Sequence, residues 1–284
     1  MRMKLQFWSF LIVGIFFLGC EEEPPVIKFK QKPLLDTTYY GAAPAQQLKK
    51  VWLADVTGVR CNNCPRAAEL AKKFYEDNPG RIEIIALYPN AGVLTWAWDG
   101  YDTLNSSDAD QIIGETPSSL PKGMIDRVVY NGSVLVDELA WGSVINQQLL
   151  KTTPINLGIT TSWFEDEDKG RIEVKAVANT AVNKPVLWVI GILEDKIIGA
   201  QSDSRISGGL DKEYEHNHVL RSVVGSAIGD TIAKKMDVPG YTVERHYFVD
   251  RKPNWNADNL SVMVWVIDAE TREILQTRTA KMKP

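Results

Sequence analysis

Two cysteines three positions apart constrain this chain more than any other feature of its sequence. The 284 residues include three cysteines, Cys20, Cys61 and Cys64. Cys20 ends an apolar N-terminal segment, whereas the other two stand between an apolar run suited to a buried strand and an amphipathic helix. A Cys-x-x-Cys pair in this position performs redox chemistry, forms a stable disulfide or contributes to a metal site.

The N-terminal segment has the pattern of an export signal. Arg2 and Lys4 give it a positive start, and residues 7–18 form an apolar run. This run is too short to cross a bilayer, which takes about 20 residues. Residues 17–20, Phe-Leu-Gly-Cys, resemble a bacterial lipobox, which implies cleavage before Cys20 and acylation of that cysteine. The alternative is an ordinary secretory signal in which the cysteine has no role.

We therefore expect a signal peptide over residues 1–19 and a lipid-anchored tether over residues 20–30. The tether begins with three glutamates and two prolines after Cys20, a composition that stays extended and solvated. It resembles the surface-export signal of some Gram-negative lipoproteins, or it is a plain spacer. Loss of the signal peptide removes two positive charges, so the net charge changes from −4 to −6. This charge argues against nucleic acid as a partner, and membrane contact is expected through the anchor at Cys20.

Residues 31–153 alternate strand and helix patterns and are predicted to form the first domain. Residues 51–56 and 81–88 are apolar runs typical of buried strands. The helix expected between them, which ends at residues 78–80, carries an apolar face at i, i+3, i+4 and i+7: Ala67, Leu70, Ala71 and Phe74.

The same domain should continue with a hairpin and a closing helix. Asn131-Gly132 is a strong hairpin signal between residues 124–130 and 134–136. Residues 138–150 then read as a helix with one apolar stripe, which consists of Leu139, Val144, Ile145 and Leu149.

This order of elements, with the cysteine pair at the start of the first helix, resembles thioredoxin. The resemblance implies that Cys61 is a nucleophile and Cys64 its resolving thiol. It also implies that Asp55 is a buried acid that takes a proton from Cys64, and that Pro121 follows a cis peptide bond. The helix N-terminus and Arg60 would both stabilise a thiolate on Cys61.

Pro65 argues against a strongly activated thiolate. Because proline fits the first turn of a helix, the helix is predicted to start with Asn63 as its N-cap, which leaves Cys61 outside. As a staple, the disulfide would contribute only about 2 kcal/mol, because its loop is short. A zinc site would have two of the four ligands it needs. A redox pair, a disulfide that shapes a binding loop and a metal site all stay open.

An insertion over residues 91–119 carries aromatic side chains near the cysteine end of the domain. Trp96, Trp98 and Tyr101 would line a groove there, or they would simply cover the sheet. We favour the second interpretation because most aromatic rings in proteins lie in the core.

Residues 154–284 change character and are predicted to form an all-β domain. Alternation is clear in Ile172, Val174 and Ala176, and again in residues 262–266. The pattern indicates a two-sheet sandwich, immunoglobulin-like in general form. Seven strands are expected at residues 155–164, 171–179, 185–198, 216–224, 241–249, 260–267 and 273–280.

Two histidines in the second domain form a weak candidate for a metal site. His216 and His218 stand at i and i+2, which places them on one face if the segment is a strand. A metal could bridge them with Glu215 or His246. The alternative, which we favour, is a hydrogen-bonded structural role, and the sequence predicts neither a metal nor a cofactor.

Three blocks of this sequence look like a known family of bacterial lipoproteins. Residues 57–65, 120–123 and 216–221, with the late strand at residues 262–266, resemble the twenty-eight-kilodalton outer-membrane-protein family of Gram-negative lipoproteins. The resemblance implies an α/β thioredoxin-like N-terminal domain followed by an all-β immunoglobulin-like sandwich. It also implies lipid anchoring in the outer membrane, facing the periplasm or the cell surface.

Two functions of different classes follow from these observations. The first is a binding or adhesion module whose partner is an envelope or extracellular protein. The second is an envelope thiol-disulfide oxidoreductase in which Cys61 attacks, Cys64 resolves and Asp55 and Pro121 support the chemistry. We favour the first because Pro65 follows the pair and the usual Trp-Cys-Gly-Pro-Cys context is missing.

Overall fold

The computed structural model describes residues 36–90 and 92–283. The predicted signal peptide, Cys20 and the tether lie outside the described residues. Leu35–Pro284 forms one compact unit, and the domain boundary predicted after residue 153 falls inside it. No helix in the described part of the chain has the length and apolarity needed to cross a bilayer.

The first half of the unit mixes short strands with three helices. Its elements are β1 (Thr37–Tyr40), β2 (Val51–Val56), α1 (Cys64–Asp77), β3 (Ile82–Leu87), α2 (Ser107–Ile113), β4 (Lys122–Ile125) and α3 (Trp141–Leu149). Short 3-10 turns lie at Val93–Thr95 and Glu138–Ala140.

The second half consists of strands joined by turns. They are β5 (Ile155–Phe164), β6 (Lys169–Ala178), β7 (Val186–Glu194), β8 (Ile197–Ser202), β9 (Leu210–His216), β10 (Val219–Val224), β11 (Asp230–Ala233), β12 (Tyr241–Asp250), β13 (Leu260–Asp268) and β14 (Ile274–Lys281). The predicted β-rich fold is confirmed, but two of the expected strands are broken. Lys196 and His218 adopt positive φ values of 59° and 57°, which interrupts the runs expected at residues 185–198 and 216–224.

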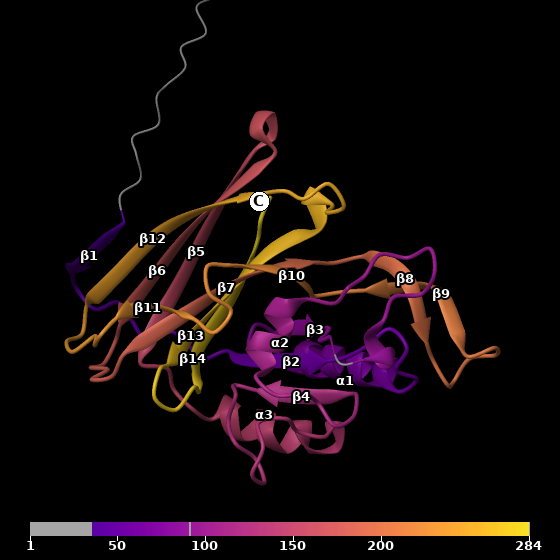
Figure 1. Cartoon of the computed structure of the whole chain (residues 1–284). Coiled ribbons are helices and arrows are strands. Elements are labelled where there is room, and N and C mark those ends of the chain that lie inside the picture. Colours follow the sequence, from indigo (N-terminus) through magenta and orange to yellow (C-terminus); the bar gives the residue numbers. More distant parts are fainter. Residues whose placement is uncertain (1–35, 91, 284) are drawn as a thin grey trace, which may run out of the picture. The chain divides into compact units, whose positions relative to one another are not determined.

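The strands form two larger sheets and a separate ribbon (Figure 1). One sheet has the order β1-β12-β6-β5, and the other has the order β14-β13-β7-β10-β3-β2-β4, with β11 also paired to β7. β3 pairs in parallel with β2 and with β10. The second sheet therefore runs without interruption from the β-rich second half of the chain into the α/β first half.

Both faces of this second sheet are covered. Trp188 and Val264 point into the core shared with the β5, β6 and β12 strands. The alternate residues, such as Val189 and Trp265, pack into another core that contains Ile112 of α2. Because α2 comes from the insertion at residues 91–119, that segment helps to join the two halves of the chain, and it was not expected to contain a helix.

The helices of the first half confirm most of the local predictions. α1 has Asn63 as its N-cap and a proline in its first turn, as expected. α3 packs Trp141, Val144 and Ile145 into the core, but the predicted stripe was wrong at Leu139, which is 92% exposed. Leu139 lies in the 3-10 turn before the helix, so it does not share the helical spacing.

The predicted hairpin is correct at its tip and wrong in the length of its first strand. Tyr130 and Ser133 pair across Asn131-Gly132, whose φ values are 51° and 87°. These positive values suit the two-residue turn of a hairpin. β4, however, ends at Ile125, because Asp126 and Arg127 also adopt positive φ values.

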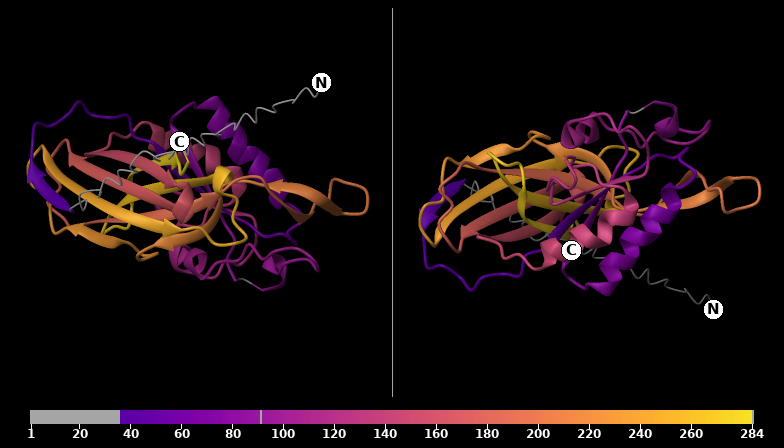
Figure 2. Two further views of the ribbon diagram at one scale, coloured as in Figure 1. Left: turned by 90° about the horizontal axis from the view of Figure 1, so that it is seen from above. Right: turned by 90° about the horizontal axis from the view of Figure 1, so that it is seen from below.

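The β8–β9 ribbon pairs only with itself and extends away from the sandwich strands (Figure 2). It lies at the end of the fold that carries the N-terminal part of α1, next to the cysteine loop (Figure 1).

Candidate functional site

The cysteine loop joins β2 to α1, and its two sulfur atoms form a disulfide. Cys64 is the first residue of α1, whereas Cys61 lies before the N-cap, as predicted from Pro65. Cys61 is only 3% exposed and Cys64 only 1% exposed. An incoming disulfide or thiol therefore has almost no access to the pair in this conformation.

The β8–β9 ribbon seals the loop through backbone and side-chain hydrogen bonds. The Gln201 side-chain amide donates to the carbonyl oxygens of Gly58 and Cys61 at 3.2 and 3.1 Å. The Ser202 amide donates to the Val59 carbonyl oxygen at 2.8 Å. Sequence reasoning missed these contacts because they join residues about 140 positions apart.

An arginine fastens the tip of the ribbon to α1. Arg205 donates two hydrogen bonds to the Glu69 carboxylate at 2.7 and 2.8 Å. It also binds Asp203 on its own turn at 2.7 Å. Paired arginine–carboxylate bonds fix orientation well, although these side chains are partly exposed, so solvent screens their contribution to stability.

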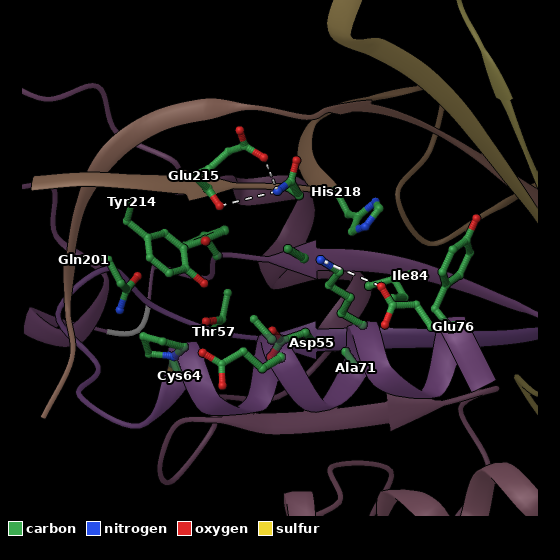
Figure 3. A pocket seen from close by; sticks show the side chains of 18 residues that line it. Asp55, Thr57, Cys64, Ala71, Glu76, Ile84, Gln201, Tyr214, Glu215 and His218 are labelled. Carbon is green, nitrogen blue, oxygen red and sulfur yellow. Dashed lines mark hydrogen bonds and ion pairs between the residues drawn. The ribbon is translucent and has the colours of Figure 1, made fainter. Parts of the chain in front are cut away.

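A cavity of about 520 Å³ opens beside the disulfide, between α1 and the chain around the end of β9 (Figure 3). Asp55, Thr57 and Cys64 line its inner part, and Ala68 and Tyr75 line the side formed by α1. The opposite wall includes Gln201, Tyr214 and His218. The sequence therefore identified several residues of the cavity, but no local signal pointed to Gln201 or Tyr214.

Asp55 is the perturbed acid of this cavity. Burial raises its pKa from 3.8 to about 7, with a smaller contribution from the negative charge of Glu138. One of its carboxylate oxygens has no hydrogen-bond partner. The Asp55 carboxyl is therefore partly protonated near neutral pH, and it lines the same cavity as Cys64.

The predictions for Arg60 and Pro121 differ in how they agree with the structure. The Arg60 guanidinium stacks over Trp98, 4.1 Å from the ring centroid, and donates to the carbonyl oxygens of Trp96 and Ala97. The expected role of Arg60 beside a Cys61 thiolate therefore has no support in this geometry. The Leu120–Pro121 peptide bond is cis, as predicted, but the described lining of the cavity does not include Pro121.

The aromatic groove that was the less favoured interpretation of the insertion corresponds only to a small hollow. Trp98 and Tyr101 line a hollow of about 20 Å³, and Trp96 is 58% exposed. Trp98 packs against the Val59 cluster, which agrees with the interpretation that such rings mainly cover the fold.

His216 and His218 do not act as a pair. The buried His216 ring shares a hydrogen bond of 2.9 Å between its Nδ1 and the Tyr88 hydroxyl, and burial lowers its pKa to about 4. The pKa of His218 is also lowered, mainly by burial, and its Nδ1 lies 3.3 Å from Asp195 Oδ1. The turn at Asn217-His218 removes the shared strand face on which the metal hypothesis depended.

Comparisons with known proteins agree with the resemblance noted in the sequence. The sequence profile of the family described as Outer membrane protein Omp28 matches residues 112–284. The chain therefore belongs to the Omp28 family of outer-membrane proteins. A search of curated protein sequences found no match.

Two solved structures share the fold at low sequence identity, and a third is similar over a smaller part of the chain. HBP35 of Porphyromonas gingivalis has a TM-score of 0.63 at 14% identity, covering 87% of this chain and 78% of that one. AGR_C_4864 from Agrobacterium tumefaciens has a TM-score of 0.51 at 13% identity, covering 84% of this chain and 97% of that one. A domain of the outer membrane lipoprotein Omp28 from Porphyromonas gingivalis is 21% identical over 46% of this chain and 90% of its own, with a TM-score of 0.32. At these identities the first two likenesses concern the fold alone.

Proposed function

We propose that this outer-membrane lipoprotein is a binding module that holds a segment of an envelope or extracellular protein in the cavity beside α1. The observation that carries this proposal is the contrast between the two features of the site. The Cys61–Cys64 disulfide is buried beneath the ribbon, whereas the neighbouring cavity is open and about 520 Å³ in volume. In this proposal the disulfide shapes one wall of the cavity and does not react.

The lining favours a segment that combines apolar and basic side chains. Ala68, Ile84 and three tyrosine rings supply apolar surface. The lining contains four acidic side chains, Asp55, Glu69, Glu76 and Glu215, and one lysine, Lys72, although Arg205 pairs with Glu69 and Asp55 is partly protonated near neutral pH. Complementary charge steers a basic partner towards such a cavity and disfavours an acidic one.

We further propose that the first half of the fold is thioredoxin-like and the second half immunoglobulin-like. Three features support a thioredoxin-like first half: β2 pairs in parallel with β3, β2 pairs antiparallel with β4, and the disulfide lies at the start of α1. The core between the β1-β12-β6-β5 sheet and the strands β7 and β13 supports an immunoglobulin-like second half. A thioredoxin-like scaffold whose reactive loop is covered is consistent with a binding role.

One observation favours a second candidate, an envelope thiol-disulfide oxidoreductase. Asp55, with a pKa of about 7, lines the same cavity as Cys64. Once a dithiol donor had reduced the pair, the Cys61 thiolate would attack a substrate disulfide. That attack would form a mixed disulfide with Cys61 and release one substrate thiolate. Asp55 would then accept the Cys64 proton as the Cys64 sulfur attacked Cys61 Sγ, which re-forms the Cys61–Cys64 disulfide and releases the second substrate thiolate. This chemistry requires the ribbon to leave the cysteine loop, which makes it the weaker candidate.

Site-specific photo-crosslinking in intact cells tests the binding proposal. Benzoylphenylalanine at Tyr75 places the reactive ring in the cavity, and the same residue at Phe248, an exposed aromatic on β12, is the control. We expect an adduct of defined mass from position 75 that disappears when Ala68→Trp fills the cavity. An adduct that Ala68→Trp leaves unchanged, or none at position 75, would contradict the proposal.

A further inference from the structure

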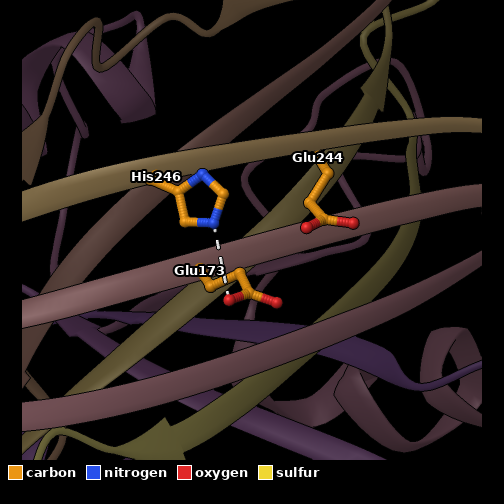
Figure 4. A group of neighbouring side chains, drawn as sticks. All are labelled: Glu173, Glu244 and His246. Carbon is orange, nitrogen blue, oxygen red and sulfur yellow. Dashed lines mark ion pairs between the residues drawn. The ribbon is translucent and has the colours of Figure 1, made fainter. Parts of the chain in front are cut away.

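A second group of chemically reactive side chains lies on the other sheet. It consists of Glu173 on β6 and Glu244 and His246 on β12 (Figure 4). One ligand atom of each residue lies within 4.8 Å of the other two. Ile172 and Val174 point into the sandwich core, so alternation along β6 places Glu173 on the opposite, outer face.

Strand register brings the three side chains together. β6 and β12 are antiparallel, with His246 directly opposite Glu173 and Glu244 opposite Lys175. Glu244 is therefore the diagonal neighbour of Glu173 and stands two positions from His246 on the same face of β12. Directly opposed and diagonal residues of a sheet are within reach of long side chains, so the backbone itself sets this arrangement.

His246 is buried at this cluster without a hydrogen-bond partner. Its side chain is only 6% exposed, and neither ring nitrogen makes a hydrogen bond. Nε2 points at the Glu173 carboxylate, with 3.4 Å between Nε2 and Oε2. A buried polar group that lacks a hydrogen-bond partner costs free energy. A ligand that joined Nε2 to the two carboxylates would remove this cost.

The spacing and the donor types fit a transition-metal cation. Bonds of about 2.0–2.1 Å in a tetrahedral site separate neighbouring ligand atoms by roughly 3.3–3.4 Å, which matches the distance between His246 and Glu173. One imidazole and two carboxylates suit Zn²⁺ and related ions, whereas Ca²⁺ and Mg²⁺ favour oxygen ligands alone. Nδ1 of His246 faces Asp36 Oδ1 at 3.8 Å. A carboxylate on that side favours the tautomer that leaves Nε2 free to bind a metal.

We propose that Glu173, Glu244 and His246 bind a divalent transition-metal cation such as Zn²⁺. Three protein ligands leave one position for water or for a group of another molecule. Lys175 Nζ lies 3.6 Å from Glu244 Oε2, so its ammonium group competes with the cation for that carboxylate. A bound cation would link β6 to β12 across the outer face of the sheet.

Calorimetric titration of the full chain in detergent tests this site. The protein carries no polyhistidine tag, is treated with EDTA and dialysed, and is titrated with ZnCl₂ and with CaCl₂. We expect tight Zn²⁺ binding and much weaker Ca²⁺ binding. His246→Gln and Glu173→Gln should each weaken Zn²⁺ binding at least about tenfold. Lys175→Met should strengthen it, and the control Glu213→Gln, an exposed carboxylate on β9, should leave it unchanged.

Thermal unfolding supplies a second measurement on the same variants. Zn²⁺ should raise the melting temperature of the unmodified protein and of Glu213→Gln, but not that of Glu173→Gln. Glu173→Gln preserves side-chain shape, so it still tests the site if His246→Gln fails to fold. Zn²⁺ affinity that is unchanged in Glu173→Gln, or Ca²⁺ binding as tight as Zn²⁺ binding, would overturn the proposal.

Discussion

Replacing Gln201 with leucine should both destabilise the fold and expose the disulfide. The Gln201 amide nitrogen lies 3.2, 3.1 and 3.0 Å from the carbonyl oxygens of Gly58, Cys61 and Ser202. In the variant, the Gly58 oxygen still accepts a hydrogen bond from the Cys61 amide, and the Cys61 oxygen still accepts one from the Cys64 amide. The variant therefore loses the two hydrogen bonds that one NH₂ group can make. At about 0.5–1.5 kcal/mol each, the free energy of unfolding should fall by about 1–3 kcal/mol.

The same loss should accelerate reduction of the disulfide in the native protein. If the ribbon must open before dithiothreitol reaches the sulfurs, the reduction rate should rise by about 5- to 150-fold, the factor that matches 1–3 kcal/mol. Thiol release under native conditions and urea unfolding of the oxidised protein measure the two effects. Gln111→Leu, an exposed glutamine on α2, is the control. A less stable Gln201→Leu protein whose disulfide is reduced at the unmodified rate would refute the reasoning.

Three further predictions concern pH, packing and anchoring. Because burial raises the pKa of Asp55 from 3.8 to about 7, the folded state holds a proton that the unfolded state releases. The free energy of unfolding should therefore fall by about 3 kcal/mol between pH 4 and 7, and Asp55→Asn should flatten this fall in urea unfolding. An unchanged slope would contradict the assignment. Gly123→Ala would place Cβ 2.2 Å from the Trp141 indole nitrogen, so it should lower the free energy of unfolding by about 1–3 kcal/mol. The control Gly41→Ala should not, because its Cβ meets only an ordinary van der Waals contact. Equal urea midpoints for the two variants would refute this. Cys20→Ser should leave the fold intact and release the protein from membranes; retention after a high-salt wash would reject the anchor.

Local chemistry made several features predictable. Pro65 indicated that α1 begins after Cys61, and the structure has Asn63 as the N-cap. Asn131-Gly132 identified the tip of the hairpin because both residues accept positive φ. Alternation also identified the inward side chains of β6 and β13. Each of these signals depends on residues that are neighbours along the chain.

The features that were missed depend on distant contacts or on overlooked local signals. Gln201 covers Cys61 across 140 positions, and no periodicity encodes such a contact. Helix α2, in contrast, had signals that sequence reasoning could have used. Ser106 caps it by accepting a hydrogen bond from the Asp108 amide, and Gly114 ends it with a φ of 79°. This helix covers the second face of the sheet and so helps to hold Leu35–Pro284 in one compact unit.

The histidine hypothesis failed for a local reason. It assumed a continuous strand through His216 and His218, but the positive φ of His218 turns the chain between them. Among the described residues, the side chains that do cluster as possible metal ligands are His246 and two glutamates from paired strands. The register that brings them together could not be read from the spacing of histidines along one segment.

The reduction potential of the Cys61–Cys64 pair tests the central claim most directly. The full chain in detergent is equilibrated with dithiol redox buffers, and the thiol and disulfide forms are separated after alkylation. A disulfide that shapes a binding cavity beneath the β8–β9 ribbon should have a potential below about −300 mV, where the glutathione pool does not reduce it. A potential between about −120 and −270 mV, the range of exchange enzymes, would contradict the binding account and favour the oxidoreductase.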